Sequence, residues 1–113
     1  MNIKELMELT GAELLTKNVD LTAEVESGYS CDLLSWVMAH GKPGMAWITV
    51  QTHMNVVAVA TLHDMACVIV PEGANVPDEV YTKAEEEGIA MFSSPKSAFE
   101  LSGLLYGAGL AGK

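Results

Sequence analysis

The chain has 113 residues, of which half are hydrophobic, and its 15 acidic residues against six lysines give a formal net charge of −9. This length suits one domain with a real hydrophobic core, and the composition excludes a disordered chain. Because the surface is acidic and the sequence contains no arginine, we expect neither nucleic acid nor an anionic membrane as a partner.

The cysteines and the N-terminal segment predict the compartment. Cys31 and Cys67 stand alone, and such cysteines are more often small buried apolar residues than a disulfide or a site. The segment MNIKELMELT is charged and lacks a long apolar core, so we expect no signal peptide. No window reaches about 18 uninterrupted apolar residues, the length of a membrane span. A reducing cytoplasm is therefore the predicted location.

Short elements are predicted at the N-terminus. Asn2 is a typical cap for a first helix, and Gly11 is a typical residue to end it. Two short strands are predicted over Ala12–Thr16 and Ala23–Glu26, with a turn between them.

A loop and a helix are predicted next. Gly28–Asp32 is predicted as the loop, and Ser30 or Asp32 as the cap of the helix that it enters. The helix is indicated by apolar spacing through residue 40, and the sequence GKPG ends it in a turn.

The chain is organised around Trp47–Gly73, which contains three apolar runs separated by polar breaks. The outer runs, Trp47–Val50 and Ala66–Val70, are short and rich in Ile and Val, as is typical of strands buried on both faces. Met54–Leu62 is predicted as a buried helix, because about ten residues is the shortest crossover between neighbouring parallel strands. Its β-branched valines leave a strand as the alternative.

The C-terminal part continues the alternation. A helix is predicted to start within Asn75-Val76-Pro77-Asp78-Glu79, with the proline near its first turn and the two acidic side chains favouring the positive end of the helix dipole. A short strand follows over Ile89–Phe92. Ser94-Pro95 is predicted to open the last helix, and the glycines after it to leave a loose tail.

From residue 32 onward, helices and strands alternate in the predicted order. Such alternation implies an α/β fold with three layers, α/β/α, and a mostly parallel sheet, here of roughly five strands. Residues 1–113 are treated as a single domain because no linker or repeat is visible.

A ligand site is expected where the parallel strands end. Loops at the carboxyl ends of such strands form the binding crevice of an open sheet, and helix N-termini there favour an anion. With no arginine, a bound phosphate would need backbone amides, helix N-termini or lysines. The candidate ligand-binding residues in these loops are Tyr29, Asp32, Gln51, Thr52, His53, Asn55, Glu72, Gly73 and Ser94.

These residue types also have structural interpretations. Thr52, Asn55 and Ser94 are of the types that commonly cap helices. A lone surface histidine such as His53 is more often structural or idle, so we expect His53→Ala to cost under about 0.5 kcal/mol of stability.

Catalytic and metal-binding patterns are missing from the sequence. Cys31 with His53, or Cys67 with His63, would have to meet in space, and no nucleophile signature surrounds either cysteine. The histidines and cysteines lack metal-ligand spacing, and no Walker phosphate loop occurs. We therefore expect no catalytic site, no metal site and no cofactor.

Several phrases of the sequence together resemble a known family. They are IKEL and GAE in residues 3–13, GYSCDLLS in 28–35, WITVQTHMN in 47–55, EG and PDE in 72–79, AEEEGI in 84–89, and residues 94–105. The chain resembles a stand-alone DRTGG domain. That module lies beside the catalytic domain of HPr kinase/phosphorylase, at the front of some phosphotransacetylases, and between the CBS motifs of certain pyrophosphatases.

The resemblance implies a non-catalytic regulatory domain in bacteria that forms a homodimer and senses an adenine nucleotide. A mean hydropathy of +0.24 agrees with a buried partner surface. The literal family string is absent, and Pro71-Glu72-Gly73 stands where other members carry Thr-Gly-Gly. The alternative is an interaction scaffold, without a ligand of its own, for a larger enzyme or redox complex.

Overall fold

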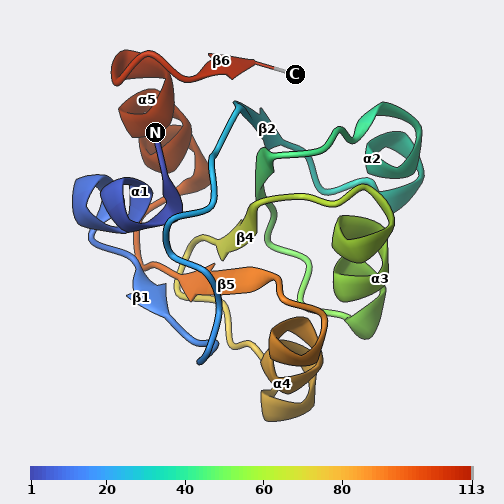
Figure 1. Cartoon of the computed structure of the whole chain (residues 1–113). Coiled ribbons are helices and arrows are strands. Elements are labelled where there is room, and N and C mark those ends of the chain that lie inside the picture. The colour runs from blue at the N-terminus through green and yellow to red at the C-terminus, as the bar shows by residue number, and fades with distance from the viewer. Residues whose placement is uncertain (113) are drawn as a thin grey trace.

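The computed structural model describes residues 1–112, which form a six-stranded sheet in the order β1-β5-β4-β3-β2-β6 (Figure 1). β1 pairs with β5 antiparallel, and every other pair in the sheet is parallel. The mostly parallel sheet is thus confirmed, with one strand more than the predicted five. The strands are β1 Glu13–Leu14, β2 Ser27–Ser30, β3 Met45–Ile48, β4 Cys67–Val70, β5 Ala90–Ser93 and β6 Ala111–Gly112.

Helices cover both faces of the sheet, so the predicted three layers are confirmed. α2, α3 and α4 lie on one face, and α1 and α5 on the other (Figure 1). In residues 1–112, no helix has the length and apolar character needed to cross a membrane. The helices are α1 Ile3–Thr10, α2 Leu34–His40, α3 Met54–Leu62, α4 Asp78–Glu86 and α5 Ala98–Gly107.

The core has two halves because neighbouring side chains of a strand point to opposite faces. In β3, Met45 and Trp47 join the cluster under α2, α3 and α4. Ala46 and Ile48 join the cluster under α1 and α5. All four residues of β3 and all four of β4 are buried, which explains why these strands are continuous apolar runs in the sequence.

The central strand–helix–strand unit is confirmed. β3 and β4 are parallel neighbours, with Ala46 opposite Cys67 and Ile48 opposite Ile69, and α3 bridges them. The strand alternative for Met54–Leu62 is excluded, because two neighbouring parallel strands need a crossover between them. Tertiary context thus outweighs the strand preference of the valines.

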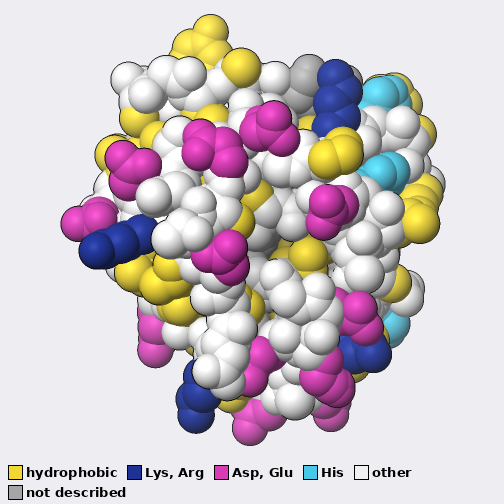
Figure 2. Space-filling model, in the orientation of Figure 1, with side chains coloured by type: hydrophobic (Ala, Val, Ile, Leu, Met, Phe, Trp, Pro, Cys, Tyr) yellow, Lys and Arg dark blue, Asp and Glu magenta, His cyan; other side chains and the backbone are white. Residues whose placement is uncertain are grey.

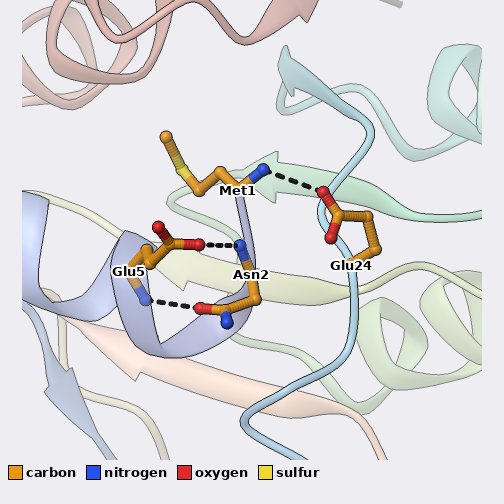
Figure 3. Close-up of polar contacts among 4 residues, drawn as sticks. All are labelled: Met1, Asn2, Glu5 and Glu24. Carbon is orange, nitrogen blue, oxygen red and sulfur yellow. Dashed lines mark hydrogen bonds and ion pairs between the residues drawn. The ribbon is translucent and has the colours of Figure 1, made fainter.

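Local capping signals define α1 as predicted. The Asn2 side chain accepts a hydrogen bond of 2.8 Å from the Glu5 backbone N–H, and the Glu5 carboxylate accepts one of 2.9 Å from the Asn2 N–H (Figure 3). Gly11 ends the helix with φ of +67°, a conformation that favours glycine. The Met1 amino group pairs with Glu24 at 2.8 Å and fastens the chain end to the next segment.

Two predictions near the N-terminus are wrong. Ala23–Glu26 forms an isolated bridge through Glu24 rather than a strand. The strand lies further on, at Ser27–Ser30, so most of the predicted loop Gly28–Asp32 is β2. Sheet pairing explains the difference, because β2 is hydrogen-bonded to β3 on one side and to β6 on the other. The glycine-rich tail that supplies β6 was predicted to be loose.

Two helix starts also differ from the prediction. α2 has Leu33 at its N-cap with no side-chain cap, so neither Ser30 nor Asp32 caps it. α5 begins after Ser97, which forms a capping box with Glu100, rather than at Ser94-Pro95. Ser97 and Glu100 have the spacing of a capping box, and this signal outweighs the Ser-Pro pair.

Candidate functional site

The carboxyl ends of four parallel strands lie at one edge of the sheet. The pairing registers align Ser30 with Ile48, and Val70 with Ser93, at the ends of β2, β3, β4 and β5. Because each predicted site residue lies at or just after one of these ends, the topology brings all nine to this edge. Tyr29 and Asp32 belong to β2 and its loop; Gln51, Thr52, His53 and Asn55 follow β3; Glu72 and Gly73 follow β4; Ser94 follows β5.

Asp32 joins the ends of β2 and β3. Its Oδ1 accepts hydrogen bonds of 2.9 Å from the Thr49 hydroxyl and 2.9 Å from the Val50 N–H. The Gln51 side-chain amide donates to the Asp32 carbonyl at 3.1 Å, so Gln51 takes part in the same contact. The side chains of Asp32 and Gln51 therefore have a structural role at this edge.

Histidine caps α3, in place of the predicted Thr52 and Asn55. His53 is the N-cap residue, and its Nδ1 accepts a 3.1 Å hydrogen bond from the Asn55 backbone N–H. The Val56 N–H bonds back to the His53 carbonyl, so a second amide of the first turn also has a partner. These contacts reduce the capacity of the α3 N-terminus to hold an anion.

α4 and α5, which also start at this edge, are poor anion sites. Asp78 and Glu79 lie in the first turn of α4 and repel a phosphate. In α5, Ser97 accepts from the Glu100 N–H, and the Glu100 carboxylate returns the contact. The N-termini of α3, α4 and α5 therefore give little support to the phosphate recognition expected from the sequence, whereas α2 has neither a side-chain cap nor an acidic residue in its first turn.

The loops after β4 and β5 are tied to each other. The Glu72 N–H donates to the Lys96 carbonyl at 2.8 Å, and the Gly73 N–H donates to the Ser94 carbonyl at 2.9 Å. Ser94 is buried, and its hydroxyl accepts from the Lys96 N–H at 3.1 Å, so it stabilises a turn instead of capping a helix. Glu72 and Gly73 both have φ of +64°, and Glu72 is exposed.

Tyr29 differs from the loop residues because it lies within β2 and packs against the core under α2. Burial raises the pKa of its hydroxyl, the neighbouring Cys31 thiol raises it further, and a hydrogen bond with Trp36 lowers it. The Trp47 indole N–H donates to the Cys31 carbonyl at 2.8 Å, which fixes the end of β2 over β3. Tyr29 is thus a partly buried residue that packs against the core.

The cysteine–histidine pairs considered from the sequence are engaged elsewhere. Cys67 is fully buried, and this burial raises the pKa of its thiol to about 12, so it stays protonated at neutral pH. His63 donates from Nε2 to the Met38 carbonyl at 2.8 Å, and His53 caps α3. Among residues 1–112, no three His, Cys, Asp or Glu side chains are grouped to hold a metal ion.

A groove of about 520 Å³ lies where α5 meets the ends of β2 and β3, and the sequence reasoning did not identify it. Of the nine predicted residues, Tyr29 contributes to its lining; the rest is mainly small or apolar. The groove depends on how α5 and the tail pack against β2, which no local pattern shows. The exposed aromatic residues of α5, Phe99 and Tyr106, are the sequence signal that was available.

The sequence matches no protein-family model, and no curated protein matches it. Its structure is similar to a solved one: the CBS and DRTGG domains of the regulatory region of Clostridium perfringens pyrophosphatase, complexed with its activator, diadenosine tetraphosphate. The TM-score is 0.71 at 14% sequence identity, over 92% of this chain. This chain corresponds to 45% of that one, so it spans less than half its length. The fold is consistent with a DRTGG-type domain, as the sequence resemblance implied.

Proposed function

We propose that this chain is a non-catalytic regulatory domain of the bacterial cytoplasm, which senses an adenine nucleotide and works as a homodimer. The observation that carries the proposal is the convergence of four strand-end loops, with nine candidate residues, at one sheet edge. The structural neighbour supports it, because that protein is a regulatory region crystallised with an adenine-containing activator. In the two cysteine–histidine pairs considered from the sequence, Cys67 is buried and both histidines are hydrogen-bonded to the backbone. These pairs therefore give no support to an enzyme.

The charge of the chain sets the form of the ligand. A net charge of −9 repels free polyphosphates, and the N-termini of α3, α4 and α5 at the edge are capped or acidic. Binding would therefore depend on the base and sugar, and on a divalent cation that neutralises the phosphates. We expect Mg²⁺ to strengthen the binding of ATP and diadenosine tetraphosphate more than that of adenosine.

Thermal unfolding with adenosine, AMP, ADP, ATP and diadenosine tetraphosphate, each with and without Mg²⁺, tests this proposal. A ligand at ten times its Kd stabilises the folded state by about 1.4 kcal/mol, a Tm shift of roughly 5 °C or more for a domain of this size. GTP is the control for the base. Thr52→Ala, at another candidate residue of the loop after β3, should abolish the shift, whereas Asp20→Asn, at a distant turn, should keep it. No shift with any of these nucleotides would contradict nucleotide sensing.

A second candidate is an interaction scaffold, favoured by α3. This helix is mostly apolar, yet Met54 and Leu62 on its outer side are 37% and 66% exposed. A shallow groove of about 360 Å³ lies beside them, and its lining also includes Lys83 of α4 and Glu87 at the end of that helix. The scaffold would be favoured if a stable partner co-purifies with the wild type but not with Leu62→Glu, and if no nucleotide shifts the Tm.

A further inference from the structure

α5 carries apolar side chains around its circumference, but this chain covers one side of it. Leu101 and Leu105 are buried against the sheet. Phe99 and Tyr106 are 89% and 76% exposed. Positions three, four and seven apart share one side of a helix, so Gly103 lies between the two aromatic rings on the outer face. In Figure 2, hydrophobic side chains lie at the upper edge of the molecule, near the end of α5 and β6.

The groove of about 520 Å³ lies beside this outer face. Its lining includes Ser30, Ile48, Ser102, Gly103, Leu105 and Leu110. None of the described residues that line it carries a charge. A Cβ atom on Gly103 would meet nothing within 4 Å, so the space above this glycine is open to an approaching group. A projecting aromatic ring and a cavity able to receive one therefore lie next to each other.

The charge of the chain and of the groove indicates which partner this surface would bind. A second copy of a chain with net charge −9 is repelled wherever carboxylates face each other. The uncharged groove avoids this repulsion, whereas α4 presents Asp78, Glu79 and Glu86. A basic partner would gain most from surfaces such as α4 and least from the α5 groove. The groove thus suits a second copy better than a protein of opposite charge.

The arrangement also has the symmetry that a two-fold dimer requires. In such a dimer the same patch is used on both copies, so a projection and its receiving cavity must lie on one face. Phe99 itself lines the groove, so the ring and the cavity lie on one face, and Gly103 in the same lining lets two helices approach closely. A stable interface buries about 800 Å² on each partner, roughly one seventh of the 5702 Å² surface of this chain.

We propose that the outer face of α5 and the adjoining groove form the two-fold interface between two copies of this chain, with Phe99 of each copy in the groove of the other. This inference rests on the homodimer in the proposed function and assigns its surface. It leaves the outer side of α3 exposed in the dimer.

Sedimentation velocity and light scattering on four forms of the chain test this interface. The wild type should be a dimer, and Phe99→Glu should be a monomer with an unchanged circular-dichroism spectrum, because an 89% exposed side chain does not support the monomer core. Gly103→Leu fills the open space above the helix and should also give a monomer. Leu62→Glu, 66% exposed on α3, is the matched control and should remain dimeric.

The outcomes separate this inference from the proposed function. Suppose that the wild type is a dimer, that Leu62→Glu dissociates it, and that Phe99→Glu and Gly103→Leu stay dimeric. This result would overturn the α5 interface but not the homodimer. A monomeric wild type would overturn both the interface and the homodimer. Nucleotide sensing is read independently, by the thermal shift of the monomeric Phe99→Glu variant.

Discussion

Replacing Asp32 with alanine should destabilise the folded chain by about 1–2 kcal/mol. The variant removes the carboxylate that accepts the two 2.9 Å hydrogen bonds from Thr49 and Val50. Hydrogen bonds to charged groups contribute about 1.5–3 kcal/mol each where solvent is excluded. Asp32 is exposed, so water competes for its carboxylate and the expected total falls below that sum. Thr49 is 1% exposed, so water can hardly replace the carboxylate to which its hydroxyl donates.

Urea denaturation followed by tryptophan fluorescence measures this loss, and a double-mutant cycle with Thr49→Val isolates the pair. We expect a coupling energy of about 0.5–1 kcal/mol between Asp32 and Thr49, because residues that share a hydrogen bond are not additive. Asp32→Asn keeps an accepting oxygen without the charge and should lose roughly half as much. An Asp32→Ala variant within 0.5 kcal/mol of wild type, or a cycle with no coupling, would refute the proposed link between β2 and β3.

Two further predictions concern a cap and a thiol. His53→Ala should cost about 1 kcal/mol in urea denaturation, typical of a lost N-cap and more than the surface value expected from the sequence. Asn55→Ala should cost less, because Asn55 contributes its backbone N–H to that contact; equal losses would contradict the assignment. Because burial raises the pKa of the Cys67 thiol from 9.0 to about 12, a thiol reagent at pH 8 should modify Cys31 alone in the folded chain and both cysteines in urea. Unfolding lets Cys67 ionise at its ordinary pKa, so stability should fall as pH rises from about 9 toward 12, with a smaller fall in Cys67→Ala.

Phe99→Glu and the nucleotide series address assembly and ligand separately. If the α5 surface joins two copies, the loops at the carboxyl edge remain available to a ligand, apart from the ends of β2 and β3 that line the groove. A nucleotide that contacts those ends would change the dimer dissociation constant. Binding and assembly would then be linked by equal factors in both directions.

The sequence alone determined the elements whose signals are local. Asn2 and Gly11 fix the ends of α1 through hydrogen bonds within a few residues of each other. The two apolar runs around Met54–Leu62 are long enough, and close enough in sequence, for the parallel pair β3 and β4 to be deduced. From this alternation followed the three layers and the edge at which the candidate residues converge.

Tertiary structure alone decided the features that depend on distant partners. Ser27–Ser30 has no strong strand preference and becomes a strand because β3 and the C-terminal residues pair with it from both sides. Asp32 does not cap α2 as expected, because its carboxylate accepts hydrogen bonds from the Thr49 hydroxyl and the Val50 N–H across the sheet. The groove beside α5 exists only where a helix, two strand ends and the tail meet, and these come from residues 28 to 112 of the chain. A local pattern fixes what one segment forms, whereas the contacts between segments fix which groups are left free to bind.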